Sequence, residues 1–276
     1  MSSFVGKVAI VTGGASGIGR SLCEALSDRG ATVIVADLNG KAAADVARKL
    51  IDCGGKAYAF EVDVSDSQAL SRLIQDTVAA HQHLDYMFNN AGFGVVGEFR
   101  DSTPEHWRKI MDVNLMGVVY GTLAAYRVML AHGTGHIVNI ASVTGLIPSP
   151  ILIPYSTTKC GIIGFSLSLR PEAATLGVKV SVVCPSLVDT SMGDRTVCLN
   201  ANKADYLARL PRRMMMSPAA TAKAILRGVA KNRAMIIFPW HARLLWWLNR
   251  LCPALLGPIS ALSIREWRKL RSPGKT

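Results

Sequence analysis

Residues 8–19 limit the possible folds more than any other part of this sequence. The run Val8–Val11 is continuously apolar, as expected for a strand buried on both faces. It leads into Thr-Gly-Gly-Ala-Ser-Gly-Ile-Gly, and an amphipathic helix is predicted from about Arg20 to Asp28. A strand, a glycine-rich turn and a helix together form a cradle for a diphosphate at the helix N-terminus. The spacing Gly13-x3-Gly17-x-Gly19 differs from the usual G-x-G-x-x-G, and a glycine turn can be simple geometry, so the interpretation depends on the strands and helices after the turn.

The next segments alternate between strand and helix patterns. This alternation predicts an α/β fold with a doubly wound parallel sheet flanked by helices. Strands are expected at 32–36, 57–62 and 84–88, and helices at 41–52 and from Ser65 or Asp66 to about Ala80. Ligands in such sheets lie at the carboxyl ends of the strands, which is where Asp37, Asp63 and Asn89 fall.

Asp37 stands 18 residues after Gly19 and ends the second expected strand. A carboxylate there can accept hydrogen bonds from an adenosine ribose and would repel a 2′-phosphate. Neither Ser16 nor Leu38 supplies a compensating cation, so the sequence favours NAD over NADP. The alternative is an ordinary helix-capping or turn aspartate.

Tyr155 and Lys159 are four residues apart, so on a helix they share one face. A lysine cation beside a phenol favours the phenolate, which suits a proton transfer to or from a hydroxyl or carbonyl oxygen. Ser142 follows an expected strand at 137–141 and therefore emerges at the carboxyl edge of the sheet. Taken alone, such a pair is more often a packed ring and a solvated amine.

In this order and at these separations, the motifs resemble the short-chain dehydrogenase/reductase family over roughly residues 5–240. The matching stretches are Thr12–Gly19, Asp63-Val64, Asn89-Asn-Ala-Gly92, Asn114, Ser142, Tyr155-x3-Lys159, Pro185 and Thr190-x-Met192. The resemblance implies a Rossmann-type sheet, a nicotinamide cofactor, hydride transfer at a carbinol carbon, and commonly a homodimer or homotetramer.

The resemblance also implies a role for each matching residue. Tyr155 would be the acid/base, Ser142 would bind the substrate oxygen, and Lys159 would bind the nicotinamide ribose and lower the Tyr155 pKa. Asn114 would lie in a bent helix and anchor a water that relays protons from Lys159. The implied cofactor-binding residues are Gly13, Ser16, Gly17, Ile18, Gly19, Asp37, Leu38, Asp63, Val64, Asn90, Ala91, Gly92, Tyr155, Lys159, Pro185, Val188, Thr190 and Met192.

Two positions depart from the family pattern. Ser186 stands where glycine usually follows the proline, which could shift the loop over the nicotinamide. Pro171 falls inside the expected long helix after Tyr155, where an interior proline costs about 3 kcal/mol. We expect a kink in that helix, which in this family often forms the subunit contact.

The expected substrate side is apolar. Residues 146–154 join Ser142 to Tyr155 without a charge, and Phe93, Val95 and Val96 follow the Asn-Asn-Ala-Gly turn. Residues 191–216 are expected to form a mobile cover that carries Met192, Met214, Met215 and Met216, although such methionines can equally be core filler. Arg209, Arg212 and Arg213 could attract an anion but are more often solvated.

Composition sets the remaining limits. Of 276 residues, 50% are hydrophobic and 18% are charged, which excludes a disordered chain. No apolar run before Lys7 has the length of a signal peptide and the six cysteines lack close pairs, so we expect a cytoplasmic protein with reduced thiols and no metal site. Of the +12 net charge, +8 lies from Lys231 onward (nine Lys or Arg against Glu266), which gives no argument for nucleic-acid binding by the body.

We expect a dinucleotide-binding and catalytic domain at 1–240 and a basic amphipathic extension at 241–276. In the extension, Leu244, Trp247, Leu248 and Leu251 have the spacing of a helical apolar face. With tryptophans and surrounding basic residues, this face could lie on a membrane surface. Equally, it could pack on a neighbouring subunit or roof the substrate pocket.

These features predict an NAD-dependent enzyme that interconverts a secondary alcohol and a ketone on an apolar molecule of steroid, terpenoid, retinoid or lipid type. The alternatives are an NADP-linked carbonyl reductase and a nicotinamide-binding regulator or scaffold without turnover. The four candidate catalytic residues together argue against the scaffold, which has no need of them.

Overall fold

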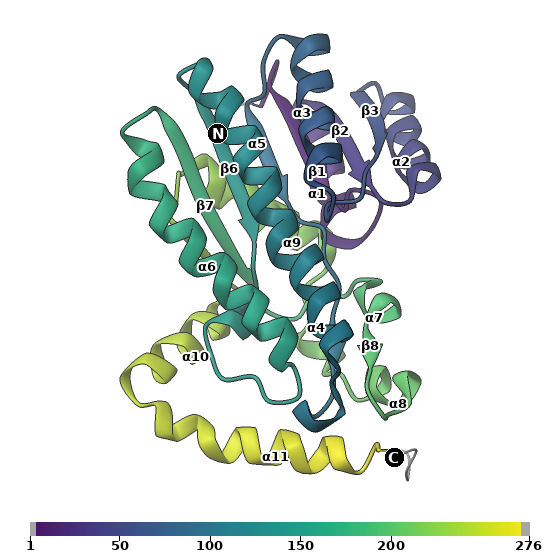
Figure 1. Cartoon of the computed structure of the whole chain (residues 1–276), viewed down its shortest axis with the longest axis vertical. Helices are drawn as coiled ribbons and strands as arrows, with labels where there is room; N and C mark the ends of the chain where they lie inside the picture. The colour runs from purple at the N-terminus through teal and green to yellow at the C-terminus, as the bar shows by residue number, and fades with distance from the viewer. Residues whose placement is uncertain (1–3, 272–276) are drawn as a thin grey trace.

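Seven parallel strands form the central sheet of the computed structural model, which describes residues 4–271 except the side chains of Leu256 and Ile259 (Figure 1). The spatial order is β3-β2-β1-β4-β6-β7-β9, so the chain starts in the middle, builds outward and returns to the other side of β1. The switch point between β1 and β4 confirms the predicted doubly wound sheet. The strands are β1 Val8–Thr12, β2 Thr32–Asp37, β3 Lys56–Glu61, β4 Tyr86–Asn89, β6 Gly135–Ile140, β7 Val178–Pro185 and β9 Met235–Phe238.

Helices cover both faces of the sheet because alternate strand residues point to opposite sides. Ala9 and Val11 of β1 pack in one buried cluster with α1, α2 and α9, whereas Val8 and Ile10 pack in another with α3, α5 and α6. The first layer consists of α1 Gly17–Ser27, α2 Gly40–Asp52 and α9 Pro218–Ala230. The second consists of α3 Ser67–His81, α5 Gly117–Ala131 and α6 Ile153–Ala174. As expected, Asp66 caps α3 by accepting from the backbone of Gln68 and Ala69.

A π-turn, η2 Asp112–Met116, joins α4 Pro104–Met111 to α5 and contains Asn114. The extra residue in such a turn bends the helix, in agreement with the bent helix expected around Asn114. Among the described residues, this stretch of 104–131 is the one helix long and apolar enough to cross a bilayer. It packs on α3, β4 and β6, as a core helix of the domain does.

The helix that follows Tyr155 runs through Pro171 and ends three residues later at Ala174. The proline falls in the last turn, so its missing N–H removes one hydrogen bond near the helix end and the helix continues. Next to it, Arg170 donates to the carbonyl groups of Val180 and Asn232.

The expected cover over the carboxyl edge of the sheet contains three short elements, α7 Met192–Arg195, β8 Val197–Cys198 and α8 Lys203–Ala208. β8 pairs in parallel with β5 Val95–Val96 and so fixes the cover to the body. Single turns complete the fold at η1 Phe99–Asp101, η3 Val143–Gly145, η4 Arg212–Met214 and η5 Pro253–Leu256.

The C-terminal extension forms two helices, α10 Trp240–Leu251 and α11 Gly257–Arg268, which run beneath the rest of the molecule in the view of Figure 1. Trp267 is 2% exposed and its ring meets that of Tyr206 edge-on, with 5.8 Å between centroids. Nearby, Arg271 joins both Glu98 and Asp101 at 2.8 Å. The far end of the extension is therefore fastened to the cover and to the loop after β5.

Candidate active site

Close packing explains each glycine of the turn after β1. Gly13 and Gly17 have φ of +64° and +54°, a region that L side chains rarely adopt. A Cβ on Gly19 would lie 2.1 Å from the carbonyl oxygen of Gly13 and 2.6 Å from the Asn90 amide nitrogen. The turn therefore carries no side chain at these three positions at the start of α1. Ser16 is the N-cap residue of α1. The cradle expected from the sequence is present.

One hollow beside this turn contains the residues predicted to hold an adenosine. It is lined by the carboxyl ends of β1, β2 and β4 and the residues after β3, namely Gly13, Asp37, Leu38, Asp63, Val64, Ala91 and Gly92. Asp37 is 7% exposed, and its carboxylate accepts from the backbone N–H groups of Ala15 and Asn39, both at 3.0 Å. These two bonds fix the carboxylate at the edge of the hollow.

Arg195 also lines this hollow, although it lies far from it in sequence. Its guanidinium donates to the Ser16 hydroxyl at 2.6 Å, across the glycine turn. No ion pair joins Arg195 to a carboxylate within residues 4–271. Neither Ser16 nor Leu38 supplies a cation, as expected, but the cover brings Arg195 to this position, and no local sequence pattern predicts that contact.

Asn90 and Asn114 hold the turn after β4 in place. The Asn90 side chain donates to the Thr12 carbonyl at 2.9 Å, and the Thr12 hydroxyl accepts from the backbone of Asn90 and Ala91. The buried Asn114 amide accepts from the Phe93 N–H at 3.0 Å and donates to the Phe93 carbonyl at 2.9 Å. Asn114 thus connects the bent helix to the edge of the site.

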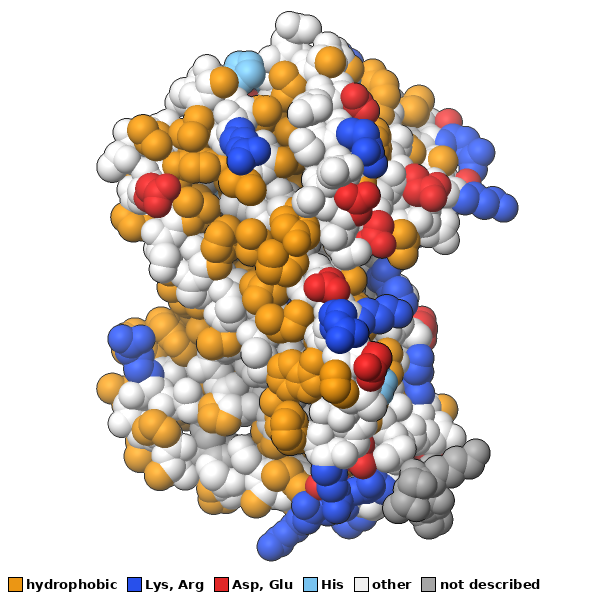
Figure 2. All heavy atoms as spheres, in the orientation of Figure 1, with side chains coloured by type: hydrophobic (Ala, Val, Ile, Leu, Met, Phe, Trp, Pro, Cys, Tyr) orange, Lys and Arg blue, Asp and Glu red, His pale blue; other side chains and the backbone are white. Residues whose placement is uncertain are grey.

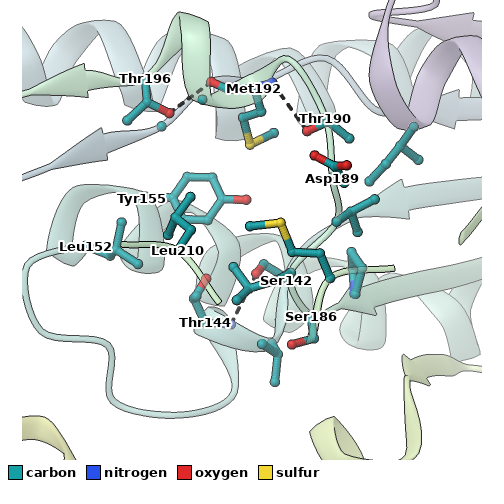
Figure 3. Close-up of a pocket in the computed structure, with 18 of the residues that line it drawn as sticks. Ser142, Thr144, Leu152, Tyr155, Ser186, Asp189, Thr190, Met192, Thr196 and Leu210 are labelled. Carbon is teal, nitrogen blue, oxygen red and sulfur yellow. Dashed lines mark hydrogen bonds between the residues drawn. The ribbon is translucent and has the colours of Figure 1, made fainter. Parts of the chain in front are cut away.

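Ser142, Tyr155 and Lys159 line one cavity of about 380 Å³ at the carboxyl edge of β6 and β7 (Figure 3). The Tyr155 hydroxyl points into the cavity, and the Ser142 hydroxyl accepts from the Thr144 N–H at 3.2 Å. Lys159 is 3% exposed, and its Nζ donates to the Ile140 carbonyl at 2.9 Å and lies 5.4 Å from the centre of the Tyr155 ring. The predicted one-turn spacing therefore brings the two groups together.

Burial dominates the acid–base properties of this pair. It lowers the pKa of Lys159 to about 8 and raises the pKa of Tyr155 to about 12, against a smaller lowering by Ser142. The family resemblance implied a lowered Tyr155 pKa; in the structure, burial of the phenol raises this pKa instead. At pH 7 a lysine with a pKa near 8 is still protonated in about nine of ten molecules.

The segment after β7 forms one wall of the cavity. Ser186, the departure from the family pattern, donates its N–H to the Phe238 carbonyl at 3.0 Å and so extends the pairing of β7 with β9. Val188 forms a bridge with Met216, and Thr190 lies so near Gly17 that a Cβ there would be 3.1 Å from it. Pro185, Val188, Thr190 and Met192 all line the cavity together with Ile18 and Asn90.

The remaining walls are mainly apolar, but several of the residues differ from those expected. Val95 and Val96 are buried in β5 beneath Tyr155, and Ile147 packs on the extension, because pairing with β8 and contact with α10 draw them inward. Met215 lines the cavity, whereas Met214 is 53% exposed. Leu152 comes from the predicted apolar segment 146–154, whereas Leu187, Tyr206, Leu207 and Leu210 were not predicted individually. Tyr206 and Leu207 lie in α8, whose apolar residues were the available signal for these two.

A family model described as "short chain dehydrogenase" matches residues 7–197. The chain belongs to this family. Membership makes it an oxidoreductase with the dinucleotide-type fold described above.

Similarity extends to curated relatives and to solved structures. EphD of Mycobacterium tuberculosis is 31% identical over 263 residues, which cover 92% of this chain but only 44% of that protein, so the chain spans less than half the length of this relative. The 3-oxoacyl-[acyl-carrier-protein] reductase FabG of Chlamydia trachomatis is 34% identical over 224 residues, which cover 80% of this chain and 89% of FabG. A short chain dehydrogenase/reductase from Burkholderia phymatum, solved in complex with NAD, has a TM-score of 0.80 at 26% identity and covers 100% of this chain and 99% of its own.

Proposed function

We propose that this protein is an NAD-dependent oxidoreductase that interconverts a secondary alcohol and a ketone on an apolar substrate. The observation that carries the proposal is the convergence of Ser142, Tyr155 and Lys159 on one cavity that opens beside the glycine turn. Bound there, a nicotinamide supplies the site that accepts or gives a hydride.

The residues present fit a dinucleotide. Backbone at Gly13 and Gly17, which a side chain would block, accommodates the diphosphate, and Asp37 accepts from the adenosine ribose hydroxyls. Leu38, Asp63 and Val64 enclose the adenine end. The carboxylate favours NAD, and the similar Burkholderia structure holds NAD.

Arg195 belongs to the same binding site in this proposal. A cation at the positive end of a helix is unfavourable unless an anion lies between them. The guanidinium at Ser16 and the N-terminus of α1 therefore both face the position of the diphosphate. The cover would close more tightly when a dinucleotide is bound.

We assign the proton-transfer role to Tyr155. In reduction its neutral hydroxyl, favoured by the raised pKa, donates to the forming alkoxide, while Ser142 donates a hydrogen bond to the same oxygen. In oxidation the phenolate is the base, and the protonated Lys159 offsets its charge. Asn114 holds the Phe93 backbone beside them and could, as the family resemblance implies, anchor a water on the proton path.

The apolar walls favour a steroid, terpenoid, retinoid or lipid-type substrate. Leu152, Leu207, Leu210 and Met215 present hydrocarbon to the cavity, and Tyr206 adds one hydroxyl. FabG, a similar protein, acts on 3-oxoacyl groups by its name, so the rival is an NADP-linked carbonyl reductase. A scaffold without turnover has no use for the buried Lys159 ammonium beside Tyr155.

We propose a homodimer or homotetramer in the cytoplasm. The outward sides of α5 and α6 carry exposed Leu123 and Leu167, at 47% and 37%, and a band of hydrophobic side chains runs over this face in Figure 2. A band of this kind marks a surface that another subunit would cover.

The test is turnover by Tyr155→Phe. A panel of apolar secondary alcohols with NAD, monitored by NADH absorbance, should show activity that falls about 10³-fold in the variant, because proton transfer is lost. NADH binding, measured by its fluorescence, should stay nearly unchanged. Tyr206→Phe is the matched control, since it removes a hydroxyl from the same cavity without touching the proposed proton path. Substantial activity in Tyr155→Phe would refute the assignment.

A further inference from the structure

The helix α10 leaves a continuous apolar face in solvent. At 100° per residue, Trp240, Leu244, Trp247, Leu248 and Leu251 fall within an arc of about 100°. All five are exposed, Trp240 at 75%, Trp247 at 51% and Leu251 at 76%. Leu255, at 57% exposed, continues this surface beyond the helix end.

The side of α10 that packs on the rest of the protein is opposite to this apolar face, so that packing does not bury the face. Ala242 is fully buried, Trp246 packs on the same buried cluster as Ile147, and Asn249 donates to the Leu146 carbonyl at 3.1 Å. The extension therefore packs with one side on the loop between Ser142 and Tyr155, and none of its described residues lines the cavity. Its other side remains without a partner in residues 4–271.

Charge indicates which partner the exposed face fits. Arg243 and Arg250 lie along one edge of the apolar arc, and α10 contains no acidic residue. No ion pair joins either arginine to a carboxylate in the described part of the chain. Hydrophobic and basic side chains are seen together over α10 in Figure 2.

We infer that α10 docks the protein on an anionic lipid surface, with the face formed by Trp240, Leu244, Trp247, Leu248 and Leu251 buried at the acyl boundary. Tryptophan settles at this depth, leucine adds buried area, and the arginines meet lipid phosphates. A second copy of the chain would instead offer Arg243 and Arg250 no carboxylate on a facing α10, because this helix contains no acidic residue. Because α10 covers the loop at the cavity, docking brings the proposed substrate site close to lipid.

Cosedimentation with vesicles tests the inference without any reference to activity. The full chain should sediment with vesicles of equal phosphatidylglycerol and phosphatidylcholine at low salt, and less with phosphatidylcholine alone. Trp247→Ser with Leu251→Ser should weaken this binding by about tenfold or more, and Arg243→Gln with Arg250→Gln should remove the preference for the anionic lipid. Ile51→Ser with Tyr58→Ser, which changes two side chains of similar exposure on α2 and β3, should bind like the original chain.

Light scattering, which measures oligomer size, distinguishes lipid docking from a contact between copies of the chain. Loss of vesicle binding by the Trp247/Leu251 variant at unchanged oligomer size supports the inference. An oligomer that dissociates in that variant shows that the face is a contact between copies and overturns it. A full chain that ignores anionic vesicles at low salt overturns it as well.

Discussion

At the scale of single residues, we propose that cofactor choice depends on Asp37 and Arg195, two of the seven charged residues that line one hollow. Asp37 is held at its edge by the N–H groups of Ala15 and Asn39, and Arg195 enters from the cover. The carboxylate repels a 2′-phosphate, whereas the guanidinium attracts whichever phosphate lies nearest. In the proposed function, the contact with Ser16 places Arg195 on the side of the diphosphate rather than of the adenosine ribose.

Asp37→Ala should therefore reduce the ratio of kcat/KM for NAD to kcat/KM for NADP. We expect kcat/KM for NADP to rise and that for NAD to fall, changing their ratio by about tenfold or more, since both repulsion and the ribose hydrogen bonds are lost. Asp37→Asn keeps an oxygen for Ala15 but removes the charge, so it isolates the repulsion. A wild-type enzyme that prefers NADP would contradict the assignment outright.

Arg195→Ala should weaken NADH binding by about tenfold, because a charge-assisted hydrogen bond to the diphosphate is lost. ADP-ribose, which contains the diphosphate, should lose affinity as a competitor by the same factor, whereas AMP should lose little. Arg209→Ala is the control, since Arg209 lies in the same cover but pairs with Glu266. Equal losses for AMP and ADP-ribose would place Arg195 elsewhere.

At the scale of elements, prediction from the sequence succeeded where local pattern decides the outcome. Strands β1, β2, β3, β4 and β6 were placed within two residues because the sequence shows a short apolar run at each, such as the run that ends at Asp37 in β2; β7 had no prediction. The predicted one-turn spacing of Tyr155 and Lys159 is likewise confirmed, because both residues lie in α6.

Contacts between distant segments could not be predicted in the same way. Trp267 has no periodic neighbours to mark it as buried, yet it is among the largest fully buried side chains, because Arg268 and Arg271 bind Glu98 about 170 residues earlier. Arg195 meets Ser16 by the same kind of tertiary contact. Local sequence carries no signal for either pairing.

Trp267→Ala should show that α11 supports the substrate cover. Loss of the ring leaves Tyr206 unsupported, so we expect KM for an apolar substrate to rise several-fold and stability to fall by about 3 kcal/mol. NADH affinity should change little, because the cofactor residues lie on other elements. Trp247→Ala removes the same side chain from a half-exposed position and should leave KM unchanged; a KM increase shared by both variants would contradict the role of α11.

At the scale of the whole molecule, Glu98 and His136 contribute to the dependence of stability on pH in the acidic range. Arg100 and Arg268 hold the pKa of Glu98 at about 2, so its contribution is present above the ordinary glutamate pKa and is lost as pH falls below about 4.5. Burial, with Lys179 and Arg170 nearby, lowers the pKa of His136 to about 3. Below about pH 4.5 the two contributions overlap, and above it only His136 of the two contributes.

His136 lies in β6 at 5% exposure, and its Nε2 is 2.9 Å from the Ser181 hydroxyl. Since Ser181 donates its proton to the Arg233 carbonyl, the neutral imidazole donates from Nε2. Between pH 3 and about 6.5 the unfolded chain binds a proton here that the folded chain excludes, so stability rises with pH in this range and levels off above it.

From pH 7.5 to 5, His136 alone should lower the free energy of unfolding by about 2 kcal/mol, before Glu98 begins to contribute. His136→Gln retains a donor for Ser181 but cannot take up the proton, so urea unfolding at the two pH values should differ by about 2 kcal/mol less than in the original chain. If His136→Gln lost as much stability on acidification as the original chain, another group would have to carry the dependence, and the buried neutral imidazole would not be its source.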